Sequence, residues 1–462
     1  MGTYTKEQLT DELNRIKTAT SACRDAIYNK GVTSIPADAS LGSLATYASM
    51  ITCDHPDILL EYIANGPDSD STRKNVYFDT GFVPTQNTRI ECRTSIHYLS
   101  DENRIFGNVY DSNWSGIRCF PGYSPGLLGG RMGSKDVYCG SINADEIYTI
   151  SIYGNYGAEM LVNETKTNAG SYSWETNDIT AYIFAEHHYS DGARTSFSGV
   201  KMYYFKIWDS NNLVRFYVPV LHYYNGQYVA CFYDKVNDNY IYNLGSGTVT
   251  YSSTGDYLLD YLGPSEETVV PVTEYSHLRY ETGIVADTTI QIDTKFRLLW
   301  GGENYIYGSA TDNTTTPSWQ TFGIGYPGKL TTLRAMLGAD ASNSRVVNMT
   351  TVGLLSSCTT SHYYENDIGK CYLNKKLFSG SSNIINFSSN TIHIFSRHGN
   401  SQNVAVRNGA RLYYCLISKS RIVQRSYVPV LHNGSPYLLD LNNGTYNSPV
   451  APGINVTYSI LE

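Results

Sequence analysis

The sequence predicts a mainly β protein, in which a short helical N-terminal segment precedes two tandem antiparallel sandwiches of the jelly-roll type. Tyrosine is unusually abundant, at 41 of 462 residues, and 39 glycines accompany it. Aromatic and β-branched residues favour strands, and glycine supplies turns. Alternating segments such as "RIECRTSI" (89–96) are separated by turn dipeptides such as Asn-Gly and Pro-Gly, and long blocks occur twice in the same order. Many short strands with such breaks are typical of sandwiches.

The first element is a predicted helical attachment and oligomerisation segment, residues 1–52. Its seam of small and apolar residues follows a heptad spacing: Leu9, Leu13, Ile16, Thr20, Cys23 and Ile27. A heptad seam predicts a helix that packs against a partner, because a helix of this length is marginal alone in water. The partner is either a second copy of the chain or another protein. The alternative is an amphipathic hairpin, formed with a second helical stretch near 41–51, that packs on the first sandwich.

The repeat is clearest at the motif "YVPVLH", which occurs at 217–222 and again at 427–432. It closes a gapless match between 199–222 and 409–432, and further blocks match upstream in the same order. Among these, 90–96 aligns with 290–296, and 179–188 aligns with 390–399. The proline inside the motif lacks a backbone N–H, so we expect this strand at a sheet edge, a bulge or a strand exit. We expect the valines to anchor a core and the tyrosine to face the opposite way.

The domain boundaries follow from the repeat. The first sandwich is predicted at 53–260, a short linker at 261–273, and the second sandwich at 274–462. The linker, "YLGPSEETVVPVT", contains two prolines and two glutamates, which make a stretch of this length fairly stiff.

Composition excludes several classes of protein. The net charge is −8, and no run of Lys or Arg is long enough to track phosphates, so nucleic acid and anionic membrane surfaces are not expected as partners. Uninterrupted apolar runs are too short to span a bilayer. The nine cysteines form no C-x-x-C pair, which predicts free thiols and no zinc site.

No set of catalytic residues is evident in the sequence. We therefore expect no enzymatic activity, no cofactor and no metal ion. Glycoside hydrolysis needs two facing carboxylates, and the one-strand pattern E-x-D-x-x-E is absent. The repeated His222 and His432 at the end of "YVPVLH" are interpreted as strand-end residues hydrogen-bonded to backbone.

The candidate ligand-binding residues are Trp114, Trp319, His187 and His398. The two tryptophans occupy equivalent positions, each ahead of a Pro-Gly turn, and an exposed indole stacks well on the C–H face of a sugar. The alternative is that each tryptophan packs under its turn as part of the core. The two histidines align with each other at a strand-to-loop boundary, where they could contribute to a binding surface.

Four stretches of the sequence resemble known families. "LTDELNRIKTATSACRDAIYNKGV" (9–32) resembles the helical attachment segments of tailed-phage virion proteins. "VYFDTGFVPTQNTRI" (76–90), "RIFG" (104–107) and "CFYDKVNDNYIYNLGSGTVT" (231–250) are similar to concanavalin A-like (laminin G-like) modules that are common in gut phages and their Bacteroidales hosts. The second copy fits this pattern less well and lacks the "EYI" opening (61–63).

The resemblance implies a phage virion structural protein, namely a head fibre, a capsid decoration or a tail-associated protein. Its lectin-like domains are expected to adsorb to host or mucosal glycans. Residues 1–52 are expected to contact other virion proteins and to associate as a homotrimer. The location is then the virion, assembled in the host bacterial cytoplasm. The alternatives are a purely structural component without ligand and, third, a glycoside hydrolase.

Overall fold

The structure is a computed structural model. It describes residues 6–29, 36, 40, 55–68, 72–100, 103–121, 126–154, 157–264, 278–298, 304–311, 320–326, 333–339, 344–349, 357–365, 368–379, 387, 389–398, 404–405, 410–450 and 456–461. The chain divides into two compact units, residues 1–56 (with residue 462) and residues 57–461. Each unit is described by itself.

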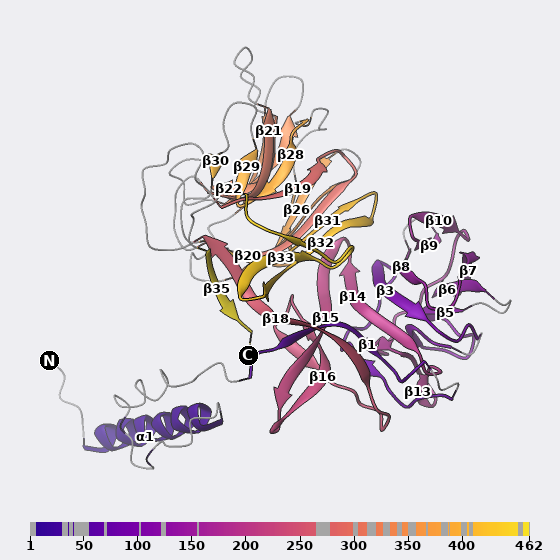
Figure 1. Cartoon of the computed structure of the whole chain (residues 1–462), viewed down its shortest axis with the longest axis horizontal. Coiled ribbons are helices and arrows are strands. Elements are labelled where there is room, and N and C mark those ends of the chain that lie inside the picture. Colours follow the sequence, from indigo (N-terminus) through magenta and orange to yellow (C-terminus); the bar gives the residue numbers. More distant parts are fainter. Residues whose placement is uncertain are drawn as a thin grey trace. The chain divides into compact units, whose positions relative to one another are not determined.

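The described part of the first unit contains one helix, α1 (Lys6–Asn29), where the heptad spacing predicts it (Figure 1). Two seam residues face solvent, since Leu13 is 57% and Ile16 44% exposed. The hydroxyl of Thr20 donates to the carbonyl of Ile16 at 2.8 Å, and Cys23 is exposed. The side chains of Leu9 and Ile27, and the stretch 41–51, lie outside the described residues. Within the described part of the chain, no helix has the length and apolar character needed to cross a membrane.

The first sandwich consists of an outer sheet and an inner sheet that pack on a shared core. The outer sheet contains β2 (Phe78–Asp79), β4 (Phe106–Val109), β5 (Gly116–Pro121), β6 (Leu127–Gly133), β7 (Lys135–Ser141), β11 (Tyr182–Ile183), β12 (Ala185–His188) and β13 (Gly192–Thr195). The inner sheet contains β1 (Ile58–Ala64), β3 (Thr88–Ile96), β8 (Ile147–Gly154), β9 (Ala158–Val162), β10 (Thr165–Asn168), β14 (Val200–Asp209), β15 (Asn212–Tyr224), β16 (Gln227–Asp234) and β17 (Asn239–Ile241). Ile90 and Phe205 of the inner sheet meet Phe106 and Ile117 of the outer sheet in this core.

The second sandwich repeats this plan. Its outer sheet contains β19 (Tyr280–Val285), β21 (Asn304–Thr311), β22 (Gln320–Tyr326), β23 (Arg334–Ala339), β24 (Ser344–Asn348), β28 (Thr391–Ile394), β29 (Ser396–His398) and β30 (Val404–Ala405). Its inner sheet contains β20 (Ile290–Leu298), β25 (Cys358–Glu365), β26 (Ile368–Leu373), β27 (Lys376–Ser379), β31 (Ala410–Lys419), β32 (Ile422–His432), β33 (Ser435–Asp440), β34 (Thr445–Asn447) and β35 (Val456–Ile460). Among the strands that the structure describes, the pairings are antiparallel except β12 with β4 and β21 with β29. The prediction of a mainly β fold with tandem antiparallel sandwiches behind a helix is therefore confirmed.

One long strand, β18 (Thr250–Pro264), joins the two inner sheets (Figure 1). Its first half pairs with β1, and its second half pairs with β32 and β35. The second half, "DYLLDYLGP" (256–264), takes the position that "DILLEYIANGP" (57–67) takes in the first copy. The opening that the second copy was expected to lack is therefore present. The first sandwich was predicted to end at residue 260 and the linker to begin at residue 261. Both limits are wrong, because 256–264 form the first strand of the second sandwich.

The predicted alignment of 90–96 with 290–296 is shifted by two residues. In the first copy Ile207 pairs with Ile90, and in the second the equivalent Ile417 pairs with Ile292. A shift of two residues leaves each side chain on the same face of the sheet, so the alternation of apolar residues does not reveal it.

The repeated motif "YVPVLH" lies where a strand changes neighbours. Pairing of β15 with β14 ends at Tyr217, and pairing with β1 begins at Val220. Pro219 falls in the gap, where its missing N–H breaks no ladder bond on that side. Tyr217 packs into the core of its own sandwich, whereas Val218 and Val220 face the other way. Pro219 therefore lies inside β15, at a local sheet edge and not at a strand exit, and the opposite facing of these side chains is confirmed.

The histidine that ends the motif is held by a buried carboxylate and not by backbone, which corrects the prediction. Nδ1 of His222 lies 2.8 Å from a carboxylate oxygen of Asp57, and the hydroxyl of Tyr240 donates to the other oxygen at 2.7 Å. The second copy repeats this arrangement with His432, Asp256 and Tyr446. In each copy, "YVPVLH" is thereby fastened to the start of the first strand.

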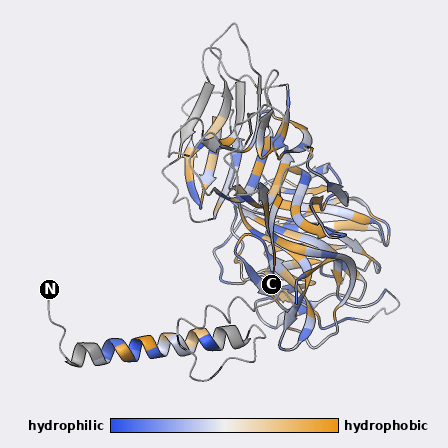
Figure 2. Cartoon of the chain, turned by 60° about the vertical axis from the view of Figure 1, so that its left-hand side comes forward, coloured by the Kyte–Doolittle hydropathy of each residue, from blue (hydrophilic) through white to orange (hydrophobic). Residues whose placement is uncertain are grey.

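The outward faces of the two inner sheets pack against each other in a third apolar core. It contains Val218 and Val220 from the first copy and Val428 and Val430 from the second. Trp208, 1% exposed, belongs to it as well. Hydrophobic residues accordingly gather along the strands of the sandwiches (Figure 2).

Candidate functional site

The candidate site surrounds Trp114, which stands on the turn between β4 and β5. Its backbone is left-handed, with φ of 64°, and the turn is held by Asp111, whose carboxylate accepts the N–H groups of Asn113 and Ser115 at 2.9 and 2.8 Å. The Trp114 side chain is 37% exposed. The alternative prediction, that Trp114 packs under its turn as part of the core, is therefore wrong.

Two guanidinium groups and a histidine border the indole. The central guanidinium carbons of Arg194 and Arg118 lie 4.6 and 5.2 Å from the ring centre. His188 approaches edge-on, with ring centres 5.2 Å apart. These residues come from β13, β5 and β12, so the outer sheet holds the groups around one exposed ring. Cation–π contacts of this kind also fix the orientation of the indole.

A single buried carboxylate lies close to three arginines beside the ring. Glu186 is fully buried, and its oxygens lie 3.0 Å from Arg104, 3.2 Å from Arg118 and 3.9 Å from Arg194. Burial lowers the pKa of Arg104, and the like charge of Arg118 acts in the same direction. Burial, and then the positive charge of Arg194, lower the pKa of His188, which favours its neutral form. Asp191 lies 3.0 Å from Arg194 as well, so the guanidinium groups beside Trp114 are paired with carboxylates.

Trp114, Arg104 and Arg118 border a pocket of about 250 Å³. It is lined by Arg104, Asn113, Trp114, Arg118, Phe120, Arg131 and Asp136. Arg131 pairs with Asp136 at 2.9 Å and donates to the carbonyl of Trp114 at 2.8 Å, which braces the tryptophan turn. An apolar ring beside guanidinium donors suits a ligand with a flat C–H face and oxygen acceptors.

The structure separates His187 from this pocket. The His187 ring stacks on Tyr182 with centres 4.1 Å apart, and its Nδ1 lies 3.2 Å from the hydroxyl of Thr180. Successive residues of a strand point to opposite faces, so the neighbour His188 contacts Trp114 instead. His398 occupies the equivalent place, opposite Ser309, but its side chain lies outside the described residues, as does the whole of Trp319.

The sequence reasoning missed the arginines and Glu186. Alternation along "GIRCF" (116–120) could have revealed one of them, because Ile117 and Cys119 are buried in the core and Arg118 must point the other way. The position of Arg194 depends on the pairing of β12 with β13, in which it lies opposite Glu186. No local pattern signals that pairing.

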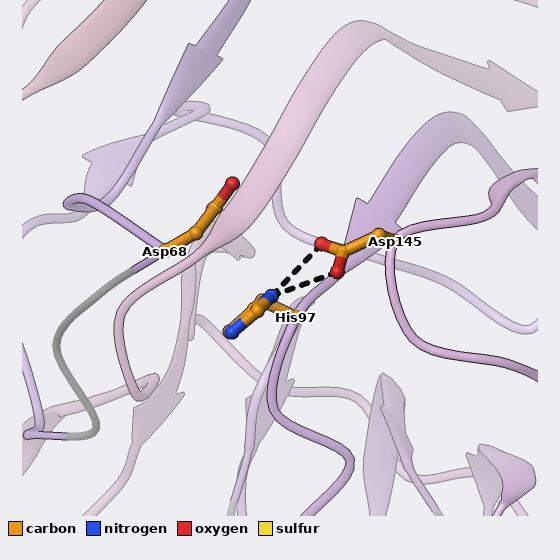
Figure 3. Close-up of side chains that lie close together, drawn as sticks. All are labelled: Asp68, His97 and Asp145. Carbon is orange, nitrogen blue, oxygen red and sulfur yellow. Dashed lines mark hydrogen bonds and ion pairs between the residues drawn. The ribbon is translucent and has the colours of Figure 1, made fainter.

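One cluster near the other end of the first sandwich has the residue types of a metal site. Asp68, His97 and Asp145 each offer a ligand atom, all within 4.8 Å of one another (Figure 3). Nδ1 of His97 is already paired with Asp145 at 2.9 Å, and the ammonium group of Lys201 lies 2.6 Å from Asp68. A divalent cation would have to displace both interactions.

The eight cysteines that the structure describes, Cys23 among them, form no disulfide and are free.

Comparison with known proteins gives no family for this chain. No family model matches it. No curated protein matches it. Among solved structures, domains LG4-5 of the mouse laminin α1 chain match 87% of this chain and 95% of that one, with 9% identity and a TM-score of 0.27. The LG1-3 region of the laminin α2 chain matches 88% of this chain and 90% of that one, with 8% identity and the same TM-score of 0.27. A likeness this distant carries no argument, and the fold class rests on the sheets themselves.

Proposed function

We propose that this chain is a glycan-binding virion protein of a tailed phage, and that the Trp114 pocket binds the sugar. The observation that supports this proposal is the exposed indole of Trp114, held on an outer sheet between guanidinium groups. The aromatic face would cover the C–H side of a sugar ring, and the arginines would donate to its oxygens. The chain would act as a head fibre, capsid decoration or tail-associated protein, and it would bind without chemical conversion.

The role of the helix follows from the same proposal. The virion context is suggested by the resemblance of residues 9–32 to phage attachment segments, and the exposed Leu13 and Ile16 of α1 offer a seam for a partner. Association as a homotrimer would present several Trp114 pockets together. Joining weak sites in this way raises the overall affinity without any new contact.

Replacing Leu13 and Ile16 by serine is expected to convert the full chain from a trimer to a monomer. The polar side chains remove the apolar area that the seam would bury between helices. Sedimentation equilibrium of the full chain measures the change. The control is Lys17→Ala, since Lys17 lies off the seam. A wild-type chain that stays monomeric at high concentration would rule out self-association.

Replacing Trp114 by asparagine is expected to weaken glycan binding at least about tenfold, or ~1.4 kcal/mol. Asparagine tolerates the left-handed backbone at this position, so the turn should survive. Binding is measured on a bacterial polysaccharide array and then by calorimetry on the polysaccharides that bind. The control is Tyr251→Ala, which removes another exposed aromatic side chain, 47% exposed, from a different part of the chain.

Other outcomes of that experiment would favour the alternatives. Binding that survives Trp114→Asn would show that the pocket is not the sugar site. Absence of binding to every host glycan would favour a purely structural virion component. Release of new reducing ends from a polysaccharide would instead indicate a glycoside hydrolase.

A further inference from the structure

A second pocket lies at the junction of the two sandwiches, within the compact unit 57–461. Two equivalent hairpin tips border it. Ser210 and Asn211 form the turn after β14 with φ of 51° and 66°, and Ser420 and Arg421 form the turn after β31 with φ of 50° and 68°. The pocket, called here the junction pocket, has a volume of about 220 Å³. It is lined by Asn87, Arg89, Tyr153, Gly154, Ser210, Asn211, Tyr363, Glu365, Lys370, Tyr372, Leu377 and Arg421, none of which lines the Trp114 pocket.

The wall of this pocket contains a buried cation whose hydrogen-bonding capacity is only partly used. Arg89 is 5% exposed, and its guanidinium lies against the ring of Trp208, with the central carbon 3.6 Å from the ring centre. Nη1 donates to the carbonyl of Arg421 at 3.3 Å. Nε and Nη2 have no hydrogen-bond partner among the described residues. Leaving a buried charged donor unsatisfied is costly, so an oxygen acceptor supplied by a ligand would stabilise it.

The other walls add positive charge and aromatic surface. Arg421 lies over Tyr153, 4.9 Å from its ring centre. Tyr363 and Tyr372 stack with their ring centres 6.0 Å apart.

Among the described lining residues, positively charged side chains outnumber negatively charged ones. Lys370 forms an ion pair with Glu365, the one carboxylate among the described lining residues, so within that set the guanidiniums of Arg89 and Arg421 are left in excess. Guanidinium groups bind carboxylates through parallel hydrogen bonds.

We propose that the junction pocket is a second binding site and that it takes one uronic acid unit of an acidic glycan. The carboxylate lies between Arg89 and Arg421, and the sugar ring lies against the tyrosines. The volume is below the ~300–1,000 Å³ of pockets for larger ligands, which suits a single sugar unit. Because both sandwiches build this pocket, neither one alone would bind there. The proposal does not depend on the Trp114 pocket, whose residues are different.

The test titrates D-glucuronate into the full chain that carries Trp114→Asn, so that the first pocket does not contribute. The key variant adds Arg421→Asn, which installs the residue that the first copy has at the equivalent position, Asn211, and which suits the left-handed backbone. It is expected to weaken glucuronate binding at least tenfold, and D-glucose is expected to bind far more weakly than glucuronate. The matched control is Lys375→Asn, which removes one positive charge from an exposed hairpin residue with φ of 69° outside the pocket.

Each outcome has one meaning. Glucuronate binding that persists in the Trp114→Asn background and is lost with Arg421→Asn, but not with Lys375→Asn, supports the junction pocket. Should Arg421→Asn fail to fold, Lys370→Gln replaces it and is expected to weaken binding severalfold. Binding lost with Trp114→Asn alone overturns this proposal while supporting the proposed function. Equal binding of glucose and glucuronate, no glucuronate binding, or binding unchanged by Arg421→Asn also overturns it.

Discussion

Replacing Trp208 by alanine is expected to lower the free energy of unfolding by about 3–5 kcal/mol, as removal of large buried aromatic side chains does. Trp208 is 1% exposed in the core between the two inner sheets. Its Nε1 donates to a carboxylate oxygen of Asp293, in the other sandwich, at 2.9 Å. The substitution therefore leaves a cavity and also removes a donor from a buried carboxylate.

Urea unfolding followed by far-ultraviolet circular dichroism measures this loss without relying on tryptophan fluorescence. Trp208→Phe keeps most of the volume and should lose less stability than Trp208→Ala. Tyr251→Ala, at a side chain that is 47% exposed, should change the free energy of unfolding by no more than about 0.5 kcal/mol. A loss below about 1 kcal/mol for Trp208→Ala would show that the two sandwiches do not depend on this contact.

Replacing Glu91 by glutamine is expected to cost about 3–5 kcal/mol at pH 7, because it leaves the buried ammonium of Lys206 without its carboxylate. Both side chains are essentially inaccessible to solvent, and the ammonium nitrogen lies 3.5 Å from a carboxylate oxygen. Burial lowers the pKa of Lys206 to about 8, against an upward effect of Glu91. Without Glu91 that opposing effect is lost, and the pKa falls further.

The destabilisation should shrink as the pH rises to about 9.5, since free lysine titrates near ~10.4. Above its folded pKa, Lys206 is neutral in the native state while the unfolded state still binds the proton, so stability rises with pH. Urea unfolding of wild type and Glu91→Gln at pH 7 and 9.5 measures this difference. The double variant Glu91→Gln with Lys206→Met should lack this pH-dependent recovery. An equal loss at both pH values would contradict the assigned role of the Lys206 charge.

The sequence allowed a good prediction of the architecture, because the evidence for it is local or repeated. The alternation of apolar residues, the turn dipeptides and the gapless block that ends in "YVPVLH" indicate two sandwiches, and Pro219 correctly indicates a position that has no neighbouring strand on one side. The first strand of the second copy was missed because 256–264 is short and continues a strand of the first copy. The partners of His222 and His432 were missed because Asp57 and Asp256 are far away in sequence.

The site could be predicted only in part. Trp114 is recognisable as a large aromatic residue on a turn, and the structure places it at the surface. Arg118, His188 and Arg194 around it come from three different strands, and their convergence depends on the register between β4, β5, β12 and β13. His187 and His188 differ only in which face of β12 they occupy, and that face is set by the fold.

Strand β18 has a consequence for how the protein unfolds. Its first half is hydrogen-bonded to β1 and its second half to β35, so neither sandwich can lose its part of the strand without disturbing the other. The two copies should behave as one cooperative folding unit, with a single transition in place of two. A fragment cut at residue 274 would begin without Asp256, which holds His432, and without Leu262, which belongs to its core. Although the sequence is a tandem repeat, the second sandwich is completed by a strand that the first one begins.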